Sequence, residues 1–209
     1  MPRQAGMTAA VDLYLASASP RRAELLTRLG VVYHVIPSHI DETEMDGEAP
    51  LHYVERLARA KALATQQLCQ QQGLPSKPVL AADTTVALGS TIFGKPDTPA
   101  HARAMLQQLS GQQHQVFTAV AIADQDEIVS VVSQSDVSFF TIPDTWLAHY
   151  LASGEPFDKA GAYGIQGLAE TFVRKIDGSF SGIMGLPLHE TALLLQRFAI
   201  PFVLQPKES

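Results

Sequence analysis

The sequence predicts an α/β protein. Short runs of apolar and β-branched residues alternate along the chain with longer segments whose apolar residues recur at helical spacing. Hydrophobic residues make up 46% of the chain, a share typical of a packed globular protein and not of a disordered one. The length of 209 residues suffices for one large domain or for two lobes that share a cleft.

Charge and cysteine content exclude several classes of function. The net charge of −6 argues against bulk electrostatic binding to duplex nucleic acid or to an anionic membrane. Cys69 is the only cysteine, so no intrachain disulfide can form, which suits a reducing compartment such as the cytoplasm. The chain has no C-x-x-C or H-E-x-x-H motif, so a zinc site is not expected. No apolar run approaches the length of a membrane span, and residues 1–12 are expected to be a flexible tail and not a signal peptide.

The first strand–turn–helix segment is a candidate anion site. Leu13–Leu15 is long enough for a buried strand, and Ser19 followed by Pro20 is typical of a helix start. Arg21 and Arg22 then lie in the first helical turn, where cations oppose the helix dipole and need a negative partner. Because a helix N-terminus already binds anions, the segment is either a phosphate cradle or an ordinary turn with two solvated arginines.

A second strand is expected over residues 31–36, which are rich in β-branched and aromatic side chains. Five acids follow within a short stretch: Asp41, Glu42, Glu44, Asp46 and Glu48. The last three are expected in a solvated loop. The first two lie at the end of the strand, where open α/β sheets place ligand-binding groups, and one of them could hold a divalent cation.

Pro50 starts a long helix, expected over residues 51–71. Its apolar face consists of Leu51, Val54, Leu57, Ala58, Thr65 and Leu68. Lys61 falls in the middle of that face, and an unpaired ammonium is costly to bury. The side chain either extends along the helix surface to water or borders a cleft that holds an anion, and we favour the cleft.

The run Val79–Ala82 predicts a buried strand that continues past Asp83 to Leu88. An aspartate inside an extended segment is less suited to capping a helix or closing a turn. The position therefore favours a catalytic or metal-binding carboxylate at Asp83.

Gly89 and Ser90 predict a two-residue hairpin turn. Residues 89–96 nearly match the P-loop motif, but Pro96 stands where Ser or Thr would hold magnesium, so we reject a P-loop. Lys95 remains a candidate to meet a phosphate as a point charge.

The rest of the chain predicts a helix over 97–109, strands over 114–123 and 128–141, a helix over 142–153, a strand over 172–176 and a helix over 188–198. Asp177 and Gly178 predict a further hairpin turn. The glycine-rich stretch 154–167 lacks the G-x-G-x-x-G dinucleotide motif. It either lets the backbone approach a flat ligand or forms a tight connection.

Several motifs, in this order, resemble those of the Maf family, the septum-formation-inhibitor-like nucleotide pyrophosphatases. They are Leu15–Leu26, Ile40-Asp41-Glu42, residues 57–62, Ala82-Asp83-Thr84, Gly94-Lys95-Pro96, residues 160–168 and Gly185-Leu186-Pro187. The resemblance runs from about Leu13 to Phe198, and several ordered motifs are far more specific than any single one.

The resemblance implies a mixed α/β fold of the Maf/Ham1 type, with two lobes and a central cleft in one domain over residues 13–200, followed by a tail over 201–209. It also implies hydrolysis of a nucleoside triphosphate to the monophosphate and pyrophosphate, aided by Mg²⁺ or Mn²⁺. The branch with Arg21, Thr84 and Gln166 at these positions acts on dTTP and UTP, whereas a sister branch prefers 7-methyl-GTP. A glutamine offers both a donor and an acceptor, which suits the edge of a pyrimidine.

The resemblance also implies roles for the candidate residues. Those expected to bind phosphate are Ser17, Arg21, Arg22, Lys61 and Lys95. Glu42 and Asp83 would hold the divalent cation, and Asp83 would also be the base for the attacking water.

Two other functions stay open. A non-catalytic nucleotide-binding regulator of cell division would keep the basic residues but could dispense with Asp83, and the retention of both carboxylates favours the enzyme. A pyrophosphatase for purine or modified nucleotides, such as 7-methyl-GTP, is the second. The expected partner is a nucleoside triphosphate and neither a nucleic acid polymer nor a membrane, and the sequence leaves the oligomeric state open, a homodimer included.

Overall fold

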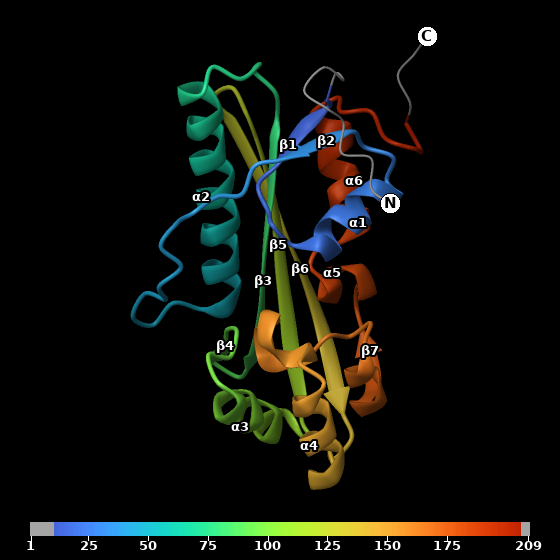
Figure 1. Cartoon of the computed structure of the whole chain (residues 1–209). Helices are drawn as coiled ribbons and strands as arrows, with labels where there is room; N and C mark the ends of the chain where they lie inside the picture. The colour runs from blue at the N-terminus through green and yellow to red at the C-terminus, as the bar shows by residue number, and fades with distance from the viewer. Residues whose placement is uncertain (1–10, 206–209) are drawn as a thin grey trace.

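The computed structural model describes residues 11–205, so residues 1–10 of the expected N-terminal tail and residues 206–209 of the expected C-terminal tail lie outside the described residues. A seven-stranded sheet forms the centre of this described part (Figure 1). Its strands are β1 (Leu13–Leu15), β2 (Tyr33–Val35), β3 (Val79–Leu88), β4 (Thr91–Phe93), β5 (Gln113–Asp124), β6 (Glu127–Phe139) and β7 (Val173–Asp177). Their order is β2-β1-β3-β5-β6-β7, with β4 paired to the end of β3. Because β1 is parallel to β2 and β3 while the other pairs are antiparallel, the sheet is mixed, which confirms the expected mixed α/β fold.

Helices cover both faces of the sheet. Within residues 11–205 the α-helices are α1 (Pro20–Arg28), α2 (Pro50–Gln71), α3 (Pro99–Leu109), α4 (Asp144–Ala152), α5 (Phe180–Met184) and α6 (Leu188–Arg197), and the 3-10 helices are η1 (Glu155–Asp158), η2 (Ala160–Ala162) and η3 (Leu168–Phe172). Figure 1 shows α2 along one face, α1, α5 and α6 on the other, and α3 and α4 at one end of the sheet. No helix in this range is long and apolar enough to cross a membrane.

Strand β3 contributes to two hydrophobic cores, because successive residues of a strand point to opposite faces. Ala81 packs in the core that contains Val54 of α2. Leu80 and Ala82 pack in the other core, together with Leu26 of α1. The alternation of β3 therefore decides which helix each of its later side chains meets.

The expected apolar face of α2 is buried for the most part. Val54, Leu57 and Thr65 are fully covered, but Leu51, in the first turn of the same face, is 37% exposed. Helical periodicity determines the angle at which a side chain leaves the helix, not whether a neighbour covers that turn.

The expected hairpin turn at Asp177 and Gly178 is also wrong. β7 ends at Asp177, and the chain then enters the short helix α5, where the Ser179 hydroxyl accepts a hydrogen bond from the Gly182 N–H at 2.9 Å. Gly178 serves a close approach to β6: its φ is +134°, and a Cβ there would lie 2.8 Å from the Ser135 Cα. A five-residue helix is too short to show an apolar period in the sequence.

Part of the expected C-terminal tail packs on the domain. Phe202 is buried, and the Val203 N–H donates to the Leu29 carbonyl oxygen, just past the end of α1, at 2.7 Å. These contacts attach residues 201–205 to the core that contains α1.

His114 of β5 lies in a buried aromatic cluster. Its Nε2 is 2.8 Å from the Tyr163 hydroxyl, and its ring packs edge-to-face against Phe139 and Tyr163. Burial disfavours the charged imidazolium and lowers the pKa of His114 to about 4. The cluster thus joins β5 to the segment between η2 and η3.

We expect this histidine to make the protein less stable in acid. Below about pH 6.5 the unfolded chain takes up a proton on His114, whereas the folded protein resists protonation until about pH 4. The unfolded state then binds more protons, so the free energy of unfolding falls through this window, by up to roughly 3 kcal/mol. His114→Gln, which stays neutral, should show a flatter dependence of this free energy on pH in urea denaturation at pH 7.5 and 4.5.

The control is His189→Gln, at an exposed position of α6. It should keep the wild-type dependence on pH. An equally steep acid loss in His114→Gln would assign the loss to other groups.

Candidate functional site

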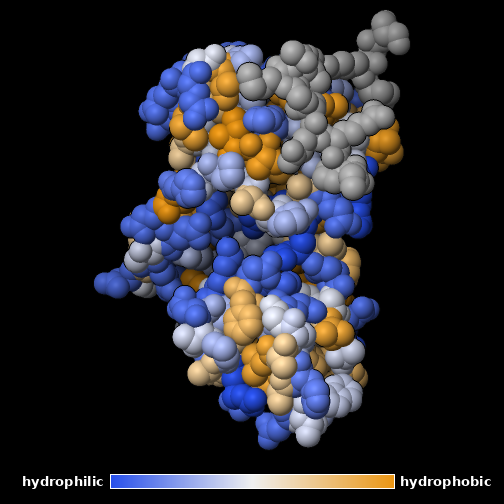
Figure 2. Space-filling model, viewed as in Figure 1, coloured by the Kyte–Doolittle hydropathy of each residue, from blue (hydrophilic) through white to orange (hydrophobic). Residues whose placement is uncertain are grey.

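A polar cavity of about 1030 Å³ lies between the upper and lower parts of the molecule in the view of Figure 2. Figure 2 shows hydrophilic side chains gathered around this hollow. The cavity opens at an edge of β3. β1 pairs with β3 only as far as Leu80, and β4 pairs from Val86 onward, so residues 81–85 have no neighbouring strand on that side in the described chain. Side chains from both faces of the sheet can reach the same space there.

All of the side chains that the sequence selects line this cavity: Ser17, Arg21, Arg22, Glu42, Lys61, Asp83, Thr84, Lys95 and Gln166. They come from the start of α1, the loop after β2, helix α2, strand β3, the segment after β4 and the segment between η2 and η3. The structure therefore brings together residues that are up to 149 positions apart in the chain.

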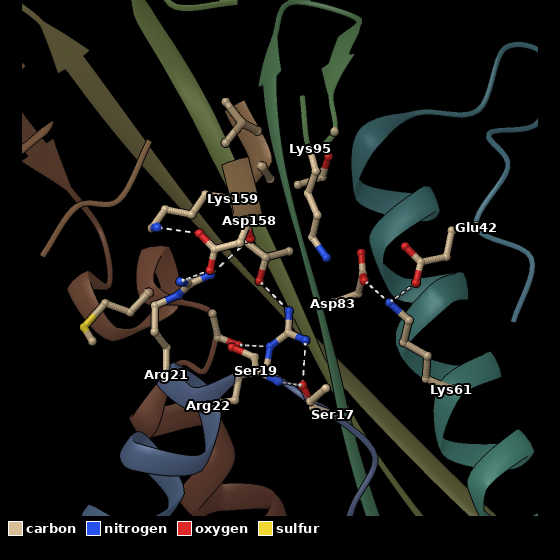
Figure 3. Close-up of a pocket in the computed structure, with 18 of the residues that line it drawn as sticks. Ser17, Ser19, Arg21, Arg22, Glu42, Lys61, Asp83, Lys95, Asp158 and Lys159 are labelled. Atoms are coloured by element: carbon tan, nitrogen blue, oxygen red, sulfur yellow. Dashed lines mark hydrogen bonds and ion pairs between the residues drawn. The ribbon is translucent and has the colours of Figure 1, made fainter. Parts of the chain in front are cut away.

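Lys61 and Asp83 form a buried ion pair at the α2 side of the cavity (Figure 3). The Lys61 Nζ lies 2.6 Å from the Asp83 Oδ1 and 2.8 Å from the Glu42 Oε1. Both the lysine and Asp83 are about one-tenth exposed, whereas Glu42 is half exposed at the rim. The anion expected beside Lys61 is thus a pair of carboxylates, and a lysine that simply extends to water is excluded.

Burial raises the pKa of the Asp83 carboxyl, and the negative charge of Glu42 acts in the same direction. The cations Lys61 and Arg22 oppose this shift. Only the Oδ1 oxygen is bound to Lys61, and Oδ2 makes no hydrogen bond with the described residues. The site therefore holds a carboxyl group with raised proton affinity and one oxygen left for another partner.

The loop after β2 brings Glu42, and not Asp41, to Lys61. Asp41 instead accepts hydrogen bonds from the N–H and the hydroxyl of Thr43. The solvated position expected for Glu48 is wrong: its side chain is 9% exposed and accepts two hydrogen bonds from Arg56 of α2, both at 2.6 Å. The sequence shows Glu48 only as one of several nearby acids. It could not be distinguished from its solvated neighbours, because its partner Arg56 lies on another element.

The carboxylates of Glu42 and Asp83 fit a divalent cation such as Mg²⁺ or Mn²⁺. Both are hard oxygen ligands, and they already converge on one cationic atom, the Lys61 Nζ. Within residues 11–205 no cluster of three or more His, Cys, Asp or Glu side chains could hold a metal. Magnesium is often bound by one or two carboxylates together with substrate phosphates, so two protein carboxylates match that pattern.

Arg22 is fixed on the other face of β3 by three oxygen atoms. Its Nε donates to the Gly185 carbonyl oxygen at 2.9 Å, and its Nη1 and Nη2 donate to the hydroxyls of Ser17 and Thr84 at 3.2 Å each. The alternative of two solvated arginines is therefore wrong. A guanidinium has five N–H donors, so two remain for a ligand in the cavity.

Thr84 is committed to this network. The Thr118 hydroxyl lies 3.0 Å from the Thr84 hydroxyl and 2.8 Å from the Gly182 carbonyl oxygen. The Thr118 hydroxyl is the donor in both contacts, so its one proton is shared between the Gly182 carbonyl oxygen and the Thr84 hydroxyl. Thr84 thus accepts hydrogen bonds from both Arg22 and Thr118.

Arg21 meets a carboxylate that sequence reasoning missed. Its Nη1 lies 3.0 Å from the Asp158 Oδ2, and the same carboxylate pairs with Lys159 (Figure 3). The predicted need for a negative partner in the first turn of α1 is confirmed, but the partner lies 137 residues away, in η1. In the sequence, Asp158 lies within a glycine-rich stretch interpreted as a ligand-approach loop or a tight connection, and no motif there identifies this aspartate.

Lys95 extends toward Asp83 from the segment after β4 (Figure 3). It is exposed and forms no hydrogen bond or ion pair with the residues that the structure describes. Among the described residues, no carboxylate neutralises this lysine, which lies opposite a carboxyl group with a free oxygen.

Known proteins share this chain's sequence over almost its full length. The family described as Maf-like protein matches residues 12–198. A dTTP/UTP pyrophosphatase of Chromobacterium violaceum is 52% identical over 186 residues, which cover 89% of this chain and 94% of that protein. Proteins of the same name from Dechloromonas aromatica and Escherichia coli are 49% and 52% identical, covering 88% and 90% of this chain and 96% and 93% of their own lengths.

We expect removal of only one member of the Lys61–Asp83 pair to destabilise the protein. Lys61→Met leaves the buried Asp83 without its closest cation, and the free energy of unfolding should fall by about 3 kcal/mol or more. The double variant Lys61→Met/Asp83→Asn removes both charges and should recover most of this loss. Urea denaturation at pH 8 measures both.

The loss in Lys61→Met should be smaller at pH 5, because a protonated Asp83 needs no cation. The matched control is Lys175→Met, whose ion pair with Asp177 is exposed and should contribute less than about 1 kcal/mol. A double variant no more stable than Lys61→Met would contradict this account.

Proposed function

The chain belongs to the family of Maf-like proteins, and we propose that it is a pyrophosphatase that hydrolyses dTTP and UTP to the nucleoside monophosphate and pyrophosphate. One observation carries the proposal beyond the likeness to named relatives. A single cavity holds a buried carboxyl with raised pKa, Asp83, and cationic side chains on each side of it. A triphosphate needs that density of positive charge, and the attacking water needs the base.

The phosphate chain is proposed to lie between Arg22 and Lys95. Arg22 has two N–H donors left after its three protein bonds, and Lys95 has no protein partner in the described range. Ser17, in the turn before α1, and Arg21, in its first turn, border the same space, where backbone N–H groups add to the anion site. Lys61 contributes charge from the α2 side, although it stays paired with Asp83 and Glu42.

Asp83 is proposed to accept the proton of the attacking water on Oδ2. Its raised pKa brings its proton affinity closer to that needed at neutral pH, and the Lys61 Nζ orients the carboxylate through Oδ1. The water oxygen forms a bond with the α-phosphorus, the bond from that phosphorus to the bridging oxygen breaks, and pyrophosphate leaves with the electron pair. Arg22 and Lys95 stabilise the charge that develops on the phosphate oxygens.

Glu42 and Asp83 would hold the Mg²⁺ or Mn²⁺ ion, which when bound adds positive charge against the triphosphate. The free, buried Cys69 supports the proposed cytoplasmic location.

Selection of the nucleobase of the substrate is proposed to involve Arg21, Thr84 and Gln166. Gln166 lines the cavity with an exposed side chain that can both donate and accept. Thr84 accepts from Arg22 and Thr118, so its proposed contribution is to hold Arg22 in place at the cavity. A site built around one base edge leaves polar groups unpaired when another base enters.

We expect Asp83→Asn to remain folded and to lose at least about 10²-fold in kcat/KM for dTTP, as removal of a general base does. Asparagine keeps the shape but takes no proton. Pyrophosphate release by the purified variant is the measurement, with circular dichroism to verify folding. Asp126→Asn, in the exposed β5–β6 turn, is the control and should match wild type. Near-normal turnover in Asp83→Asn would remove Asp83 from the mechanism.

We expect a wild-type preference for dTTP and UTP over GTP and 7-methyl-GTP, and we expect Gln166→Ala to narrow it more than it lowers kcat for dTTP. Measuring kcat/KM for the four substrates, with metal and with chelator, tests both statements. A wild-type preference for 7-methyl-GTP would favour the purine alternative. Nucleotide binding without any hydrolysis would favour a non-catalytic regulator. An unchanged ranking in Gln166→Ala would place selection elsewhere, with Arg21 the next residue to test.

A further inference from the structure

Gln166 lies in a tight turn closed by two glycines. The Gly167 N–H donates to the Gly164 carbonyl oxygen at 3.0 Å, so Ile165 and Gln166 occupy the two central positions. Ile165 is 2% exposed and packs in the core, whereas Gln166 is exposed. The position of the Gln166 side chain therefore depends on how this turn is held.

The Glu155 carboxylate holds the turn from its far end. Its Oε2 accepts a hydrogen bond from the Leu168 N–H at 2.9 Å, directly after the turn. Its Oε1 accepts from the Tyr150 hydroxyl at 3.1 Å and lies 3.5 Å from the Ala169 N–H. One carboxylate thus caps the start of η3 and ties it to α4.

Side chains from η1 and from the residue after it leave no room for a Cβ at either glycine of the turn. A Cβ on Gly167 would lie 2.4 Å from the Glu155 Oε1, and a Cβ on Gly164 would lie 2.7 Å from the Lys159 Cε. No real Cβ contact is that short, so these two side chains lie directly on the backbone of the turn. The Lys159 Nζ is fixed in turn by the Glu155 carbonyl oxygen at 2.6 Å.

The same four-residue segment also binds Arg21, because Asp158 accepts from the Arg21 Nη1 at 3.0 Å. Glu155 at the start of η1 contacts the turn, and Asp158 at its end contacts the phosphate side of the cavity. Segment η1 therefore sets the distance between Gln166 and Arg21.

We propose that Glu155 is a positioning residue for nucleotide selection, because its carboxylate holds the Gly164–Gly167 turn and so places Gln166 relative to Arg21. This inference rests on the proposed function, in which Gln166 contacts the base. Glu155→Gln keeps the length of the side chain but puts an amide NH₂ where one of two donors, the Leu168 N–H or the Tyr150 hydroxyl, needs an acceptor. The turn then loses one of the hydrogen bonds that hold it, and the Gln166 side chain is held less firmly in the position that would recognise a pyrimidine.

The experiment is a double-mutant cycle on substrate selectivity. We measure kcat/KM for dTTP and GTP in wild type, Glu155→Gln, Gln166→Ala and the double variant, and take the dTTP/GTP ratio for each. Glu155→Gln should lower this ratio about tenfold, as the loss of a hydrogen bond to a charged group would. In the Gln166→Ala background the same change should leave the ratio within about twofold, because nothing remains to be positioned.

The matched control is Glu170→Gln in η3. It makes the same chemical change near the same turn, but the Glu170 side chain is exposed and has no partner among the described residues. Its ratio should equal that of wild type. If Glu155→Gln does not fold, Tyr150→Phe removes one donor from Glu155 and should lower the ratio in the same direction, by a smaller factor.

Several outcomes would overturn the inference. An equal loss of kcat/KM for both substrates in Glu155→Gln would show a purely structural cap, as would an unchanged ratio in Tyr150→Phe. An equal change of the ratio in both backgrounds, or no effect of Gln166→Ala, would show that Glu155 does not act through Gln166. Failure of the proposed function is distinguishable, because it appears in the wild-type arm as no hydrolysis of dTTP or no preference for it.

Discussion

The ion pair between Lys61 and Asp83 is the interaction on which the arrangement of the site depends. Asp83 lies on a central strand with both neighbouring helical layers in place, so its charge needs a cation nearby. Lys61 can supply it only if α2 packs on β3 with one rotation about its axis. The rest of the α2 face, from Val54 to Thr65, is apolar and favours that same rotation. Hydrophobic packing and charge pairing therefore select one position for the helix.

The open edge of β3 explains how side chains from both faces of the sheet can line a single cavity. Asp83 points toward α2 and Thr84 toward α1, as strand alternation requires. In a fully paired strand these side chains would lie in separate layers. Here β1 ends early and β4 begins late, so residues 81–85 border the cavity directly. The carboxylates and the Arg22 network can then act on one ligand.

Three of the cations at the cavity are paired with carboxylates, whereas Arg22 and Lys95 are not paired with a carboxylate among the described residues. Lys61 is matched by Asp83 and Glu42, Arg21 and Lys159 by Asp158, and Arg22 by neutral oxygens. Lys95 alone among these cations has no partner in the described chain, and Arg22 keeps unused donors. An anionic ligand would complete both, which agrees with the proposed triphosphate substrate.

The sequence by itself determined the longer helices and strands and identified most of the polar side chains that line the cavity. The apolar period of α2 predicted that Lys61 lies on the packed face of the helix, and the extended run around Asp83 predicted that this aspartate lies inside a strand; the structure confirms both positions. Pairings between distant segments were decided only by the tertiary structure: Arg21 with Asp158, Arg56 with Glu48, and the Gln166 turn with Glu155. In each pairing at least one partner is a polar residue of a loop or short helix, so no periodicity marks it. Which of many charged side chains meet there depends on how the sheet and helices bring those segments together.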